Sequence, residues 1–314
     1  MPPVAYPGWL RSHTAHRIEQ SDCDANGHMS VRHYAEFAER AALTVGVGIG
    51  HARAIRDVVT RQHREQFLGT DLFVLFGVVS INDDAITVHI ETRSRDELAS
   101  THLVTIGIVD PDQRTLLRLP QHAFDTLQRL TEEGLIGLQP TYGQPRRVTT
   151  KPMRQPTLDE VVAHEVELWS DRVVEPVECD RSGWFSGGPA QLAWGRADQP
   201  RPRTRWQFPD ADGHPYALTN VEHRRVVFST PRVGAHLKTL AANMAIEKNR
   251  RIRREWTFDV DTGTLHAMGE FVDLVIDLEA RRAAETPDHV RRALTDHLHP
   301  ELGDPPHPPK EPPC

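Results

Sequence analysis

The chain has few of the features that would assign it to a membrane, secreted or nucleic-acid-binding class. Only three of its 314 residues are cysteine, an odd number that is most simply explained by free thiols in a reducing cytoplasm. No apolar run approaches the length that crosses a bilayer, and residues 1–7 lack the basic and apolar regions of a secretory signal. The net charge of −7 argues against a broad nucleic-acid-binding face. We therefore expect a cytoplasmic protein with neither membrane insertion nor a nucleic-acid partner.

Motifs for common cofactors are also missing. The sequence contains no glycine-rich phosphate loop, serine nucleophile elbow or dinucleotide-binding fingerprint. Although 18 residues are histidine, the close pairs His13/His16 and His28/His33 have no third ligand at a specific spacing. We expect no metal and no cofactor. A basic cluster at 248–254 fits the solvent face of a strand, or else a dock for the phosphates of a nucleotide-bearing ligand.

One short motif carries most of the chemical information. Residues 22–30, Asp-Cys-Asp-Ala-Asn-Gly-His-Met-Ser, predict an acidic turn that bends at Gly27 and leads into a helix capped by Ser30. Apolar residues then recur at three- and four-residue spacing as far as Val45, and Gly46 is a plausible stop. A helix start presents free N–H groups and partial positive charge, so a carboxylate beside it, such as Asp24, can do chemistry.

A segment of the same kind returns 156 positions later, from Glu178 to Ser186, before a second helical pattern at 191–197. Over the twenty paired positions that begin at Asp22, six residues are identical: Cys, Asp, Gly, Ser, Arg and Ala. Roughly one or two identities would arise by chance. Because the offset is close to half the chain, we predict a duplicated domain.

The remaining pattern predicts an α+β fold, with one long helix followed by antiparallel strands in each half. The predicted strands are 72–81, 85–92, 100–109 and 115–117, then 224–230, 235–246, 252–260 and 265–278. A terminal helix is expected at 288–297, capped by Thr286. The predicted boundaries are a first domain at 1–140, a proline-rich linker at 141–157, a second domain at 158–298 and a disordered proline-rich tail at 299–314.

The first motif resembles the signature of a known family. Asp24, the Gly27–His28 pair and Tyr34 on the following helix resemble hotdog-fold acyl-CoA thioesterases of the 4-hydroxybenzoyl-CoA thioesterase type. The duplication makes the whole chain similar to a tandem, or double-hotdog, member, in which two fused copies replace a homodimer. Each copy would be a long helix wrapped by an antiparallel β-sheet.

The resemblance implies a reaction and roles for the residues. The protein would hydrolyse an acyl thioester to free acid and coenzyme A, which enters only as part of the substrate. Asp24 would be the nucleophile or general base, while N–H groups at the helix start polarise the carbonyl. His28 would orient the carboxylate or relay a proton, and Glu39 would help to hold water. The candidate substrate-binding residues surround the motif: Asn26, Gly27, Met29, Ser30, Val31 and Tyr34.

Several alternatives stay open. Asp24 would suit an ordinary turn, Tyr34 a core position and Glu39 a solvated helix face. The protein could also bind acyl thioesters without hydrolysing them, or act on acyl carrier protein thioesters. The second motif is eroded, since Trp184 and Gly195 stand in place of the His and the helix acid. One working site per chain is therefore expected, and Asp180 is the candidate for a second. Chains of this kind could further assemble as homo-oligomers.

Overall fold

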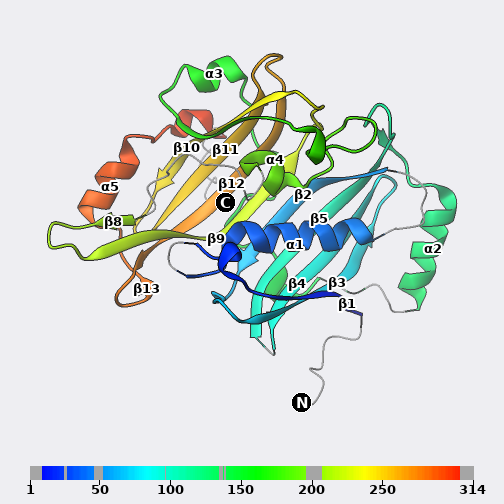
Figure 1. The fold of residues 1–314 in the computed structure, drawn as a ribbon, viewed down its shortest axis with the longest axis horizontal. Helices are drawn as coiled ribbons and strands as arrows, with labels where there is room; N and C mark the ends of the chain where they lie inside the picture. The colour runs from blue at the N-terminus through cyan, green and yellow to red at the C-terminus, as the bar shows by residue number, and fades with distance from the viewer. Residues whose placement is uncertain are drawn as a thin grey trace, which may run out of the picture.

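The computed structural model describes residues 9–24, 27–45, 52–95, 97–133, 137, 139–195 and 207–304 (Figure 1). Its strands are β1 (Arg11–Arg17), β2 (Ala52–Gln62), β3 (Asp71–Ile81), β4 (Ala85–Ser94), β5 (Glu97–Val109), β6 (Leu116–Leu117), β7 (Glu167–Val173), β8 (Gln207–Pro209), β9 (Pro215–Val227), β10 (His236–Ile246), β11 (Arg250–Asp259), β12 (Leu265–Asp277) and β13 (Arg282–Ala283). The α-helices are α1 (Val31–Thr44), α2 (Gln121–Glu132), α3 (Leu158–Val162), α4 (Pro189–Trp194) and α5 (Asp288–Thr295). Short 3-10 helices are η1 (Gln20–Asp22), η2 (Thr141–Gly143), η3 (Pro176–Glu178) and η4 (Pro300–Leu302).

All of these strands belong to one antiparallel sheet whose two halves mirror each other. The order along the sheet is β1-β3-β4-β5-β2 and then β9-β12-β11-β10-β7, with the three short strands at the side. The halves join where β2 pairs with β9, for example Val58 with Arg225. Figure 1 shows the blue and cyan half beside the yellow and orange half. Pairing the inner edges satisfies backbone groups that each half alone would leave exposed.

Helix α1 lies across the strands of the first half (Figure 1). Its apolar stripe packs on an aliphatic core, and the side chains of Ala38 and Ala41 are fully buried. The predicted start is confirmed, because Ser30 is the N-cap, although its side chain makes no capping hydrogen bond. The helix ends at Thr44, and the predicted stop, Gly46, lies outside the described residues.

The corresponding helix of the second half is much shorter than expected. Helix α4 has six residues where α1 has fourteen, and it covers Pro189–Trp194 in place of the predicted 191–197. Gly188 and Pro189 set its start, since proline suits the first helical turn. Gly195, at a φ of +70°, ends it. The two helices meet: the Arg32 guanidinium donates to the Gly195 carbonyl at 2.5 Å. No described helix is long and apolar enough to span a bilayer.

The linker and the tail are more ordered than predicted. Three successive N–H groups of the linker, those of Arg146, Arg147 and Val148, donate to one carboxylate oxygen of Glu222. At the other end, residues 299–304 are structured, and Leu302 in η4 is buried in the core of the second half. Prediction of the tail as disordered from residue 299 was therefore wrong for this part, and residues 305–314 lie outside the described ranges.

Two smaller predictions were also wrong. The N-cap of α5 is Pro287, whereas the Thr286 hydroxyl donates to the Glu247 carbonyl. The basic cluster at 248–254 was predicted to be the solvent face of a strand or a dock for phosphates. Most of its arginine side chains are neither. Three of its four guanidinium groups are buried and pair with carboxylates. Arg251 pairs with Asp273 and Arg254 with Glu270, both on β12, and Arg253 pairs with Glu255 on its own strand, β11.

Candidate functional site

The motif loop of the first half is a tight turn that two hydrogen bonds between Asp24 and His28 close. The Asp24 N–H donates to the His28 carbonyl at 2.7 Å, and the His28 N–H donates back to the Asp24 carboxylate at 3.2 Å. Gly27 sits at a φ of +76°, a conformation that favours glycine and explains the bend. Asp24 is exposed and lies in the loop that leads into α1. Asn26 lies outside the described residues.

The His28 imidazole lies at the junction of the two halves. Its Nδ1 is 3.3 Å from a carboxylate oxygen of Glu65, and its Nε2 is 3.2 Å from the Arg281 guanidinium. Arg281 belongs to the second half and also reaches Glu65 at 3.3 Å. Phe67 packs edge-on against the imidazole. The imidazole is therefore held between an acid of its own half and a base of the other.

The second motif repeats this geometry. The Asp180 N–H donates to the Trp184 carbonyl at 2.8 Å, the Trp184 N–H donates back to Asp180 at 3.1 Å, and Gly183 has a φ of +78°. Here Arg114, from the first half, pairs with the Asp180 carboxylate. The Trp184 ring lies against the Arg232 guanidinium. The matching of the two loops extends to their hydrogen bonds, although the side chains differ.

Arg114 and Arg281 occupy equivalent positions in the two halves, and neither was among the candidate site residues predicted from the sequence. Each lies just after the long last strand of its half, at a positive φ of 57° or 49°, and each reaches the motif loop of the other half. A signal was present, because Asp110 and Asp277 each precede the arginine by four positions. In both turns the aspartate accepts N–H groups two and three residues ahead.

Glu39 lies away from the Asp24 loop. It is eight residues beyond Val31, which is about 12 Å along the axis of α1. Its side chain points into the junction, where the Ala190 N–H of α4 donates to it at 3.1 Å. A Cβ at Gly188 would lie only 1.8 Å from its carboxylate, so any side chain added there would have to displace that carboxylate. Burial raises the pKa of Glu39 to about 8, although the Ala190 N–H and Arg225 counteract it.

The other candidate residues divide between core and surface. Met29 and Tyr34 are 4% and 2% exposed and pack in the core of the first half, and burial raises the pKa of Tyr34 well above its usual range. Ser30 and Val31 are half-buried at the start of α1. The structure thus brings Asp24 and His28 together and places Glu39 elsewhere, buried and not on a solvated face.

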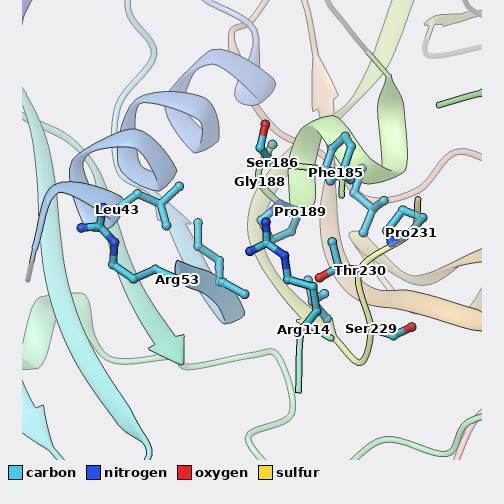
Figure 2. Close-up of a pocket in the computed structure, with 15 residues that line it drawn as sticks. Leu43, Arg53, Arg114, Phe185, Ser186, Gly188, Pro189, Ser229, Thr230 and Pro231 are labelled. Atoms are coloured by element: carbon cyan, nitrogen blue, oxygen red, sulfur yellow. The ribbon is translucent and has the colours of Figure 1, made fainter. Parts of the chain in front are cut away.

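A small cavity opens beside the second motif, between the two halves (Figure 2). Leu43 and Arg53 line it from the first half, and Phe185, Pro189 and Thr230 line it from the second. Its volume of about 30 Å³ has room for one or two water molecules. The motif that sequence analysis judged to be eroded therefore has a hollow next to it, built from both halves.

Comparison with known proteins gives a consistent answer on fold. Residues 18–132 match the model of the Thioesterase-like superfamily. The chain is similar to the 12:0-ACP thioesterase from Umbellularia californica, with a TM-score of 0.59 and 7% identity over 85% of this chain and 95% of that one. It is also similar to an acyl-ACP thioesterase from Bacteroides thetaiotaomicron, with a TM-score of 0.53 and 9% identity over 84% and 98%. No curated protein matches it significantly in sequence. The chain therefore shares the hotdog fold of thioesterases.

Proposed function

We propose that this protein hydrolyses acyl-CoA thioesters on a double-hotdog fold, with Asp24 as the reacting carboxylate. One observation carries the proposal: in the loop that leads into α1, an exposed carboxylate accepts a hydrogen bond from the His28 N–H, inside the segment that matches the Thioesterase-like superfamily. The mirrored strand order and the matching loops support the assignment of two hotdog units.

The chemistry follows from these positions. The Asp24 carboxylate either removes a proton from the attacking water, so that the C–O bond of the acid forms as the C–S bond breaks, or attacks the carbonyl itself. In the second case the C–S bond breaks to leave a mixed anhydride on Asp24, which water then hydrolyses to the free acid. The first-turn N–H of Val31 would stabilise the negative charge that develops on the carbonyl oxygen. The backbone N–H of His28 would orient the carboxylate, and its imidazole, held by Glu65 and Arg281, would return a proton to the leaving thiolate.

The second unit is proposed to lack this activity. Its Asp180 is already paired with Arg114, and the position of His28 is taken by Trp184, which cannot transfer a proton. Each chain would then have one working site. The alternative is a site where α1 meets α4, with Glu39 as its carboxylate. The pKa of Glu39 near 8 would suit an acid or a base near neutral pH.

A matched pair of variants tests the assignment. Free-thiol release is measured for the wild type, Asp24→Asn and Asp180→Asn over a panel of acyl-CoAs and the same acyl groups on acyl carrier protein. Asp24→Asn keeps the size of the side chain and its hydrogen-bond acceptor but removes the charge. We expect turnover to fall by about a hundredfold or more, the range found when catalytic groups are removed. Asp180→Asn should change turnover by less than about threefold, because the carboxylate it removes has only structural partners.

Each outcome decides something different. Normal turnover in Asp24→Asn combined with loss in Glu39→Gln would move the reaction to the junction of α1 and α4. Hydrolysis of the carrier-protein series alone would replace coenzyme A as the substrate carrier. Tight binding without turnover on any acyl group would make this a binding protein.

A further inference from the structure

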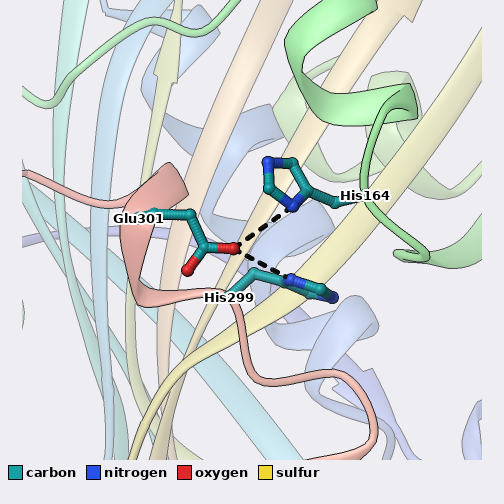
Figure 3. Close-up of side chains that lie close together, drawn as sticks. All are labelled: His164, His299 and Glu301. Atoms are coloured by element: carbon teal, nitrogen blue, oxygen red, sulfur yellow. Dashed lines mark hydrogen bonds and ion pairs between the residues drawn. The ribbon is translucent and has the colours of Figure 1, made fainter.

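A cluster of metal-ligating side chains lies apart from both motif loops, where the C-terminal segment meets the end of α3 (Figure 3). His164 follows α3, while His299 and Glu301 lie at the start of η4. The His164 Nδ1 and the His299 Nδ1 are 3.2 and 3.1 Å from the same oxygen, Oε1 of Glu301. The three ligand atoms lie within 4.8 Å of one another.

The two nitrogen–oxygen separations are close to those around a tetrahedral zinc ion. Zinc lies about 2.0–2.2 Å from imidazole nitrogen and carboxylate oxygen, which places tetrahedral ligands about 3.3–3.5 Å apart. Both nitrogen–oxygen separations are within about 0.4 Å of that edge. The side chains of His164 and Glu301 are 33% and 51% exposed, so the rings and the carboxylate have room to turn toward an ion.

We propose that His164, His299 and Glu301 bind a divalent transition-metal ion, Zn²⁺ above all, with water in the remaining position. Two imidazole nitrogens and one carboxylate are a typical zinc set that keeps an open position. Mg²⁺ and Ca²⁺ prefer shells made entirely of oxygen and are poor candidates. The ion binds the Nδ1 lone pair of each neutral ring, whose single proton is then on Nε2.

The ion would fasten the C-terminal segment to the body of the second half. Leu302 of η4 and Val161 of α3 already share one core, and the ligands add a polar clamp at its rim. The sequence alone could not show this site. His299 and Glu301 are close in sequence, but the third ligand comes from a position 135 residues earlier, and only the fold brings it near.

The test is titration of the full chain, freed of metal with a chelator, with ZnCl₂ by calorimetry. We expect one high-affinity Zn²⁺ per chain, no comparable uptake of MgCl₂, and a melting temperature that rises by several degrees with Zn²⁺. His164→Ala and Glu301→Gln should each weaken Zn²⁺ binding at least about 10- to 100-fold, the loss seen even when an outer-shell partner of a metal ligand is removed. Circular dichroism checks that both variants are folded.

The matched control is His214→Ala. His214 also contacts two carboxylates at 3.1 Å, those of Asp277 and Glu279, but through opposite nitrogens of its ring, so its partners do not converge on one point. This variant should bind Zn²⁺ like the wild type. The proposal is overturned if the wild type takes up no stoichiometric Zn²⁺ at micromolar concentration. Equal binding by His164→Ala would overturn it too, because the ion would then sit elsewhere.

Discussion

Glu39 offers a quantitative test of how the two halves are joined. Its carboxyl group is buried against α4, and its pKa rises from 4.5 to about 8. The folded protein therefore retains a proton that the unfolded chain releases between these values. Unfolding free energy should fall by about 1.4 kcal/mol per pH unit from pH 5 to pH 8, in total roughly 4 kcal/mol. This contribution is fully present below pH 4.5 and is lost as the pH rises through 8.

Glu39→Gln removes this titration while keeping an oxygen that can accept the Ala190 N–H. At pH 5 the variant and the wild type should have similar unfolding free energies. At pH 8 the variant should be more stable, by an amount approaching 4 kcal/mol. Urea denaturation followed by tryptophan fluorescence at pH 5, 6, 7 and 8 measures the difference, and subtraction cancels the groups that titrate in both proteins.

Glu91→Gln is the control with the opposite sign. Burial alone would raise the pKa of Glu91, but hydrogen bonds from His89, Tyr142 and Arg93 lower it to about 2. The contribution of Glu91 to the unfolding free energy is present above pH 4.5 and is lost only as the pH falls toward 2. The control should therefore be destabilised by the same amount at every pH from 5 to 8. The difference in unfolding free energy between the wild type and Glu39→Gln should change with pH. If that difference were also independent of pH from 5 to 8, a buried, protonated Glu39 would be refuted.

The remaining predictions concern the two helix starts. Val31→Pro removes one first-turn N–H without adding charge, and proline is compatible with a helix start. Steady-state kinetics should show a fall in turnover of about a hundred- to a thousandfold. Near-normal turnover in a folded variant would exclude this N–H as the donor to the substrate carbonyl. Gly27→Ala should cost about 1–2 kcal/mol in urea denaturation, because only its backbone conformation is strained and no atom crowds the added methyl. Gly188→Ala has an unstrained φ of −86° but displaces the Glu39 carboxylate, so it should cost about 1–3 kcal/mol. Adding Glu39→Ala to Gly188→Ala should recover part of that loss, whereas simple additivity would show that the two residues are not in contact.

The sequence predicted best where a local pattern was strong. The start of α1 and most of the later strands were confirmed to within a few residues, because apolar alternation and capping residues mark them. Strands β1, β2 and β7 and helix α2 were missed. In β1, Arg-Ser-His-Thr-Ala-His-Arg has no apolar alternation, because this edge strand is mostly exposed or half-buried. Its pairing with β3 is a property of the fold and leaves little trace in its own residues.

The site was predicted less completely than the fold, for a physical reason. Asp24 and His28 are neighbours in a turn, so their sequence reveals their proximity. Glu39 appeared to belong with them because it lies on the same helix, yet a helix carries a residue about 12 Å away in eight positions. Its true neighbour, Ala190, is 151 positions away, and no local pattern could have indicated the pair.

The reciprocal arginines explain why an eroded second unit would be kept. Arg281 reaches the motif loop of the first unit, and Arg114 reaches that of the second, so each loop is completed by the other half. The segment at 18–132 that matches the Thioesterase-like superfamily contains the loop and α1, but neither Arg281 nor the Ala190 N–H that holds Glu39. It also leaves the β2 edge without its partner β9. Under the proposed assignment the second motif has no chemistry of its own, yet the same half remains necessary for the sheet edge and for the charges around His28.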